Sequence, residues 1–137
     1  MTGAINRVSE ARGIARGERE LATLRPFFRR KIVERIVKRM FPQHQQGEIW
    51  KILNRYPSES EEIASRIHLD ALKLSGGSAD RLIELIDTAK QDRRDVIIPA
   101  ENSRLHALGV VAYAGLSDDE KDRISNEDLN EYLDWIG

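Results

Sequence analysis

The sequence predicts an all-α fold, a single compact domain of about six to eight helices. Apolar residues recur with helical spacing along nearly all of the 137 residues, and no stretch alternates apolar and polar residues as a half-buried strand does. Glycines, prolines and serine-led capping patterns separate the periodic segments. The chain is 40% hydrophobic, 33% charged and free of cysteine, so packing must hold the bundle together without disulfides.

The first 24 residues are the weakest helical segment. Their apolar residues recur loosely, and Gly13 and Gly17 each cost about 1 kcal/mol relative to alanine inside a helix. We therefore expect residues 1–24 to be weakly helical or mobile, and residues 25–137 to form the helical domain.

Residues 26–41 predict an amphipathic helix with a basic face. Pro26 suits the first turn, where its missing N–H is not needed, and Pro42 follows the last. Apolar residues cover one broad arc of the helix, and cations gather opposite them, diluted by Glu34. The candidate binding residues are these cations: Arg29, Arg30, Lys31, Arg35, Lys38 and Arg39.

Two further helices are expected before a glycine pair. Residues 46–56 keep helical spacing and stop before Pro57. Ser58 followed by Glu61 predicts a capping box at the start of the next helix, which Gly76-Gly77 ends.

The middle of the chain predicts one long helix and one nearly uncharged helix. Ser78 caps the first, whose apolar register continues to Ile98, before Pro99. The second runs from about Ala100 to Gly115. Because it carries the fewest charges, we expect it at the centre of the bundle.

Residues 117–137 predict two capped helices. Ser117 with Glu120 opens a short acidic helix, and Ser125 with Asp128 opens the final one. The final helix has apolar residues at i, i+3, i+4 and i+7, so we expect the C-terminus to be docked on the bundle.

Charge is distributed unevenly along the chain. Residues 1–56 carry thirteen Lys or Arg against five Asp or Glu, a net +8, and residues 57–137 carry nine against eighteen, a net −9. Two interpretations remain open. The halves neutralise each other within one molecule, or the basic face attracts an anionic partner.

The sequence offers no support for a metal, a cofactor, a small-molecule substrate or a catalytic site. His44, His68 and His106 lie far apart, and none stands three or four residues from another histidine. No apolar run is long enough for a membrane span or a secretory signal, so we expect a cytoplasmic protein.

Two partial motifs are interpreted as helices. Residues 117–128 follow the length of a calcium loop, but Lys121 replaces a ligand and Asp122 replaces the obligatory glycine. Residues 62–70 approach a helix-turn-helix, but His68 replaces the turn glycine, and a continuous amphipathic helix fits better.

One stretch resembles a pattern from small bacterial proteins of no assigned function. The pattern lies within residues 66–101, about a quarter of the chain, and its most distinctive part is Arg94-Asp95-Val96. The resemblance implies a bacterial, cytoplasmic origin and no chemical activity.

Two functions remain as hypotheses. The first is a non-enzymatic adaptor or assembly protein that uses the basic helix of residues 26–41 to bind another protein or a copy of itself. The alternative is nucleic-acid binding through the same face, although the overall pI of about 6.3 is low for that class. Binding to a membrane surface is disfavoured.

Overall fold

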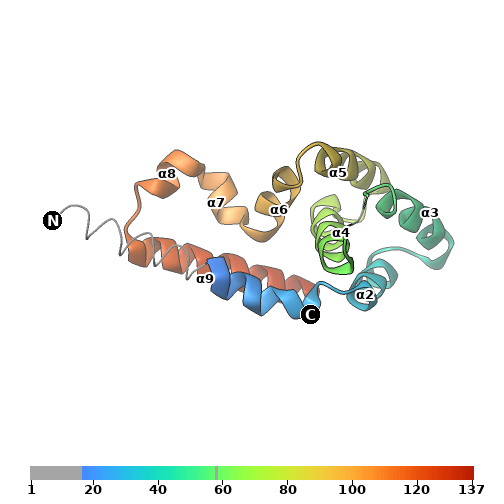
Figure 1. The fold of residues 1–137 in the computed structure, drawn as a ribbon, viewed down its shortest axis with the longest axis horizontal. Helices are drawn as coiled ribbons and strands as arrows, with labels where there is room; N and C mark the ends of the chain where they lie inside the picture. Colours follow the sequence, from blue (N-terminus) through green and yellow to red (C-terminus); the bar gives the residue numbers. More distant parts are fainter. Residues whose placement is uncertain (1–16, 58) are drawn as a thin grey trace.

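A computed structural model describes residues 17–57 and 59–137 of the chain. Within these ranges the chain consists of helices joined by short turns, with no strand, which confirms the all-α prediction (Figure 1). Residues 17–24 are helical, and the elements that follow are η1 (Arg25–Phe27), α2 (Arg30–Met40), α3 (Gln43–Leu53), α4 (Glu61–Ser75), α5 (Ala79–Gln91), α6 (Arg94–Glu101), α7 (Ser103–Leu108), α8 (Val110–Ala114) and α9 (Asp118–Ile136).

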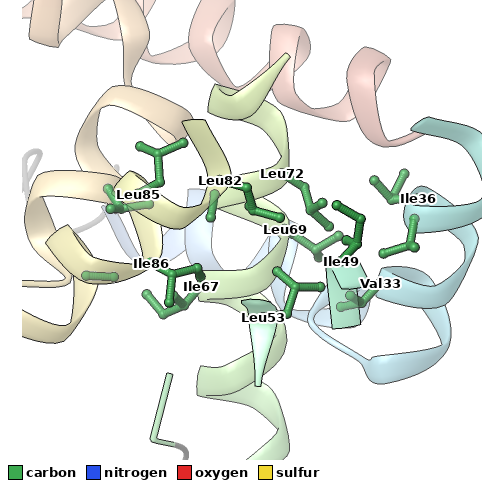
Figure 2. Close-up of a cluster of buried hydrophobic side chains, with 14 of the residues drawn as sticks. Val33, Ile36, Ile49, Leu53, Ile67, Leu69, Leu72, Leu82, Leu85 and Ile86 are labelled. Atoms are coloured by element: carbon green, nitrogen blue, oxygen red, sulfur yellow. The ribbon is translucent and has the colours of Figure 1, made fainter. Parts of the chain in front are cut away.

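Helix α4 is the centre of the fold. It packs against α2, α5 and α6, and every residue from Ile67 to Leu72 is buried. In Figure 2 its side chains Ile67, Leu69 and Leu72 lie between residues of α2 and α3 on one side and of α5 on the other. A helix that is buried on all sides must place its polar residues inside the protein as well.

The basic helix starts later than its sequence predicts. Pro26 lies in the 3₁₀ turn η1, and α2 begins four residues further on, at Arg30. Phe28 (φ −81°, ψ 65°) and Arg29 (φ −135°, ψ 147°) leave helical geometry and bring the Phe28 ring into the core. Burial of this ring therefore overrides the continuous helical periodicity.

The neighbouring helix boundaries also differ by a few residues. Helix α3 starts directly after Pro42, three residues earlier than predicted, and ends at Leu53. At the start of α4 the cap is Ser60, whose Oγ accepts a hydrogen bond of 3.2 Å from the Ile63 N–H. The predicted cap, Ser58, lies outside the described residues.

The turn between α4 and α5 follows the prediction. Gly76 (φ 60°) and Gly77 (φ 91°) occupy the left-handed region, where a residue with Cβ is strained. Ser78 then caps α5, because its Oγ accepts from the Arg81 N–H at 3.2 Å.

The long helix predicted to reach Ile98 is two helices. Helix α5 ends at Gln91, and the carboxylate of Asp92 accepts a 3.0 Å hydrogen bond from the Arg94 N–H at the start of α6. Such a side-chain bond competes with the helical pattern and favours a break. Pro99 lies inside α6, which ends two residues later.

The least charged segment is not at the centre, contrary to the prediction. Its first two residues, Ala100 and Glu101, end α6 and are buried, and the rest forms two short helices, α7 and α8, neither of which has a buried residue. Val110 is 74% exposed and Val111 is 89% exposed. In Figure 1 these helices extend away from the α2–α5 core. Low charge is therefore a poor guide to burial here, because paired polar residues fill part of the interior instead.

The C-terminal acidic region is one helix. Helix α9 continues through Ser125 and Asp128, which were predicted to start a new helix and are instead buried in its middle. The Ser117 cap at its start and the docking of its end are as predicted, since Tyr132 and Ile136 are almost completely buried.

The helix of residues 17–24 runs beside α9 (Figure 1). Arg19 Nη2 donates to Asn126 Oδ1 of α9 at 3.1 Å, and Leu24 is buried in the core. No helix in the described ranges is both long and apolar enough to cross a membrane. The rest of the predicted N-terminal segment, residues 1–16, lies outside the described residues.

The exposure of α8 makes a prediction about stability. Val111→Ser should change the free energy of unfolding by less than about 0.5 kcal/mol, because a solvated side chain contributes little. Ile86→Ala, in the core, should lower it by about 2–5 kcal/mol. Urea denaturation of both variants checks this, and a loss above about 1 kcal/mol for Val111→Ser would place α8 in the core.

Candidate functional site

The cations predicted from the sequence gather along α2 and the residue before it. Val33, Ile36 and Val37 of this helix are buried, so its cations are directed away from the core. All six predicted residues are exposed: Arg29, Arg30, Lys31, Arg35, Lys38 and Arg39, which we call the cationic face. Some of these cations contact other parts of the protein, and others have no carboxylate partner in the described chain.

Arg30 is engaged at the start of α2. Its Nε lies 3.5 Å from Glu34 Oε1, and its guanidinium lies 5.1 Å from the centre of the Trp50 ring. Its backbone N–H donates to Glu61 Oε1 at 3.2 Å. Glu61 of α4 therefore caps α2, for which Arg29 supplies no side-chain cap.

Arg35 and Arg39 bind the end of α9. Arg35 donates to the carbonyl oxygen of Ile136 and Arg39 to that of Trp135, and the Arg39 guanidinium lies 5.5 Å from the centre of the Trp135 ring. The last carbonyl groups of a helix have no partner within it and carry partial negative charge, which cations stabilise. Two of the predicted binding residues therefore hold α9 in place.

The other three cations have no such partner. Arg29, Lys31 and Lys38 form no ion pair with a carboxylate anywhere in residues 17–57 and 59–137. Arg35 and Arg39 contact carbonyl groups, which leave their charge uncompensated. The cationic face is therefore a surface with net positive charge.

A buried polar cluster, which the sequence analysis missed, joins α4, α6 and α9. The Tyr132 hydroxyl donates to Asp70 Oδ1 at 2.7 Å, and both side chains are completely buried. Arg66 forms two hydrogen bonds with Glu101, of 2.7 and 2.6 Å. The sequence held one signal of a buried aspartate. Asp70 stands three residues after Ile67 and four before Leu74, which places it on the apolar side of α4.

Asp70 favours its neutral form. Burial raises the pKa of its carboxyl well above the usual value, and the nearby charge of Glu101 raises this pKa further. Asp70 Oδ2 has no hydrogen-bond partner within the described chain, so no donor there stabilises a negative charge on this oxygen. Because Asp70 has no exposed surface, the cluster has a structural role.

A second network anchors α7 to α9. Asp128 Oδ1 accepts hydrogen bonds from the backbone N–H of Arg104 at 3.0 Å and from its guanidinium at 3.1 Å. Asp128 therefore caps α7, a different helix from its own. The sequence predicted instead that it would help to cap the final helix. Glu131 binds Lys73 at 2.9 Å, and this partner lowers the pKa of its carboxyl.

A hollow of about 240 Å³ opens between α2, α3 and α4. His68 is buried at its floor and donates from Nε2 to the Leu53 carbonyl oxygen at 2.9 Å. Trp50 meets the imidazole edge-on, with ring centres 6.4 Å apart. Burial lowers the pKa of His68 to about 4, so the ring is neutral at pH 7 and its Nδ1 can only accept.

Comparison with known proteins found no matching family model, no matching curated protein and no matching solved structure. The bacterial resemblance of residues 66–101 therefore stays a prediction. In the part of the chain that the structure describes, no three His, Asp or Glu side chains come close enough to hold a metal ion.

The buried imidazole predicts a loss of stability in acid. The folded pKa of His68 is about 4 and the ordinary value is 6.5. The stability that neutral His68 contributes is thus complete above pH 6.5 and is lost as the pH falls towards 4, by about 3 kcal/mol. His68→Gln, which keeps a donor for Leu53, should lose about 3 kcal/mol less than the wild type between pH 7 and 4.

Urea unfolding at several pH values measures this difference, and the other titrating groups cancel because both proteins carry them. Equal acid sensitivity in the two proteins would show that the imidazole takes up its proton without leaving the core.

Asp70 predicts the opposite pH dependence. The pKa of Asp70 is raised in the folded state. Its favourable contribution to the free energy of unfolding is therefore complete below pH 3.8 and is lost as the pH rises towards the folded pKa. Asp70→Asn should therefore be more stable than the wild type at pH 7, because its amide can still accept from Tyr132 and needs no proton. The gain should vanish near pH 4. Urea unfolding at both pH values tests this, and a deficit that persists at pH 7 would mean that the carboxylate is ionised.

Proposed function

We propose that this protein is a non-enzymatic interaction protein whose cationic face binds an acidic surface of another protein. The observation that carries the proposal is the uncompensated charge of Arg29, Lys31 and Lys38, three exposed cations without a carboxylate partner in the described chain. Charges of this kind raise the rate of encounter with an oppositely charged surface and help to select the partner.

The structural contacts of the other cations support a rigid face. Arg35 and Arg39 are held against the end of α9, and Glu61 fixes the start of α2. A helix that is fixed at both ends presents its free cations in a defined spacing, which lowers the entropy lost on binding.

The aromatic residues near the face favour a protein over a nucleic acid. Single-stranded nucleic acids bind through exposed rings on which bases stack. Trp50 and Trp135 are partly buried, and Arg30 and Arg39 lie over their rings. Cations of the face therefore already lie over both tryptophan rings.

Charge reversal on the face tests the proposal. Lys31→Glu/Lys38→Glu should reduce capture of acidic proteins by at least about tenfold, as measured by affinity capture and mass spectrometry. Lys90→Glu/Arg93→Glu makes the same change in net charge at the α5–α6 junction and should leave capture unchanged. Capture should also weaken between about 0.05 and 0.5 M salt, because screening shortens the range of the attraction.

Other outcomes would contradict the proposal. Equal capture by both double variants would exclude the cationic face. Loss of capture after nuclease treatment, with nucleic acid in the purified protein, would favour the nucleic-acid alternative. A molar mass that doubles at low salt and is restored to one chain by Lys31→Glu/Lys38→Glu would make the partner a second copy of this chain.

A further inference from the structure

The hollow between α2, α3 and α4 has a polar floor and an apolar wall. Ser65 and His68, which are 2% and 8% exposed, form the floor. The half-buried Trp50, Tyr56 and Ala64 line the sides, and the exposed residues Arg30, Asn54 and Glu61 complete the lining. A concave site with mostly apolar walls and a few fixed polar groups is the usual form of a binding site.

Both floor residues have unused hydrogen-bonding capacity. The Ser65 hydroxyl forms no hydrogen bond within the described chain, and neither does Nδ1 of His68. The polar atoms that are both sealed from solvent and unpartnered in this part of the chain are Asp70 Oδ2 and Asp128 Oδ2. The Ser65 oxygen and His68 Nδ1 are not among these sealed atoms, and both residues line the hollow.

The chemistry of the floor specifies the group that fits. His68 uses its Nε2 proton on Leu53, so Nδ1 requires a donor from the ligand. The aromatic and methyl walls favour a flat apolar body. A volume of about 240 Å³ is below the range of pockets for drug-sized molecules and suits one large side chain. Tyrosine and tryptophan combine an apolar ring with a single donor.

We propose that this hollow receives one tyrosine or tryptophan side chain of the acidic protein partner, with its hydroxyl or indole N–H directed at His68 Nδ1. The inference rests on the proposed function and adds the residue by which the partner is anchored. Arg30 connects the two surfaces, because it belongs to the cationic face and also lines the hollow. An anchor in a pocket beside a charged rim is the usual arrangement at protein interfaces.

Blocked amino acids test the hollow directly with the full-length protein. N-acetyl-L-tyrosinamide should shift the NMR signals of Ser65 and His68 with a dissociation constant on the order of 1 mM, typical of a ligand of this size. N-acetyl-L-phenylalaninamide, which lacks the hydroxyl, should bind about tenfold more weakly. No shift of these signals at about ten times the expected dissociation constant would overturn the proposal, as would equal binding of the two probes.

Two variants assign the binding to the hollow. Ala64→Leu fills it and should reduce probe binding at least about tenfold, while Ala107→Leu, the same change on exposed α7, should have no effect. His68→Gln removes the Nδ1 acceptor and should make the tyrosine and phenylalanine probes bind alike. Unchanged probe binding to both Ala64→Leu and His68→Gln would refute the site even if one of them were poorly folded.

The source of the side chain is distinguished by a third probe. Free L-tyrosine carries two charges that a side chain within a protein lacks, and it should bind no more tightly than the blocked form. If free tyrosine alone binds, the hollow is a site for an amino acid and the anchor proposal fails. If the Lys31→Glu/Lys38→Glu variant loses the partner while Ala64→Leu keeps it, the proposed function stands and this inference falls.

Discussion

The fold depends on satisfying the polar groups of its central helix. Helix α4 is surrounded by other helices, and it carries Asp70 and Arg66 among its apolar residues. An unsatisfied buried polar group costs several kcal/mol, so each must meet a partner. Tyr132 lies 62 residues from Asp70 along the chain, and Glu101 lies 35 residues from Arg66. These two contacts require α6 and α9 to pack at one place on α4, and the C-terminal helix therefore belongs to the core although most of its surface is acidic.

The position of α9 in turn decides what the basic helix can do. Arg35 and Arg39 stabilise the carbonyl end of α9, so their role is to join α2 to the end of α9. Lys31 and Lys38 lie on the same helix and contribute nothing to this contact. The contacts of Arg35 and Arg39 with α9 hold the face rigid. The cations without a carboxylate partner in the described chain carry the proposed interaction.

His68 links the interior to the surface of α4. Its Nε2 proton is used by the Leu53 carbonyl, and burial keeps the ring neutral at pH 7. The same contact that holds α3 against α4 leaves Nδ1 as an acceptor at the floor of the hollow. A histidine whose sequence spacing offers no support for a metal site is in this way able to serve both the packing of the core and the proposed recognition of a partner.

The sequence by itself determined the local elements, because caps, turns and helical periodicity depend on residues only a few positions apart. Ser78, Ser117 and the Gly76-Gly77 turn act on neighbouring backbone groups, and the amphipathic pattern of α2 follows from its own spacing. Tertiary structure decided which helix is central and which cations have no carboxylate partner in the described chain. The uncharged residues of α7 and α8 were expected inside but lie outside, while Asp70 and Asp128 are buried. The physical reason is that the free energy of burying a charged or polar group is set by partners far away in the chain, which helical periodicity does not encode.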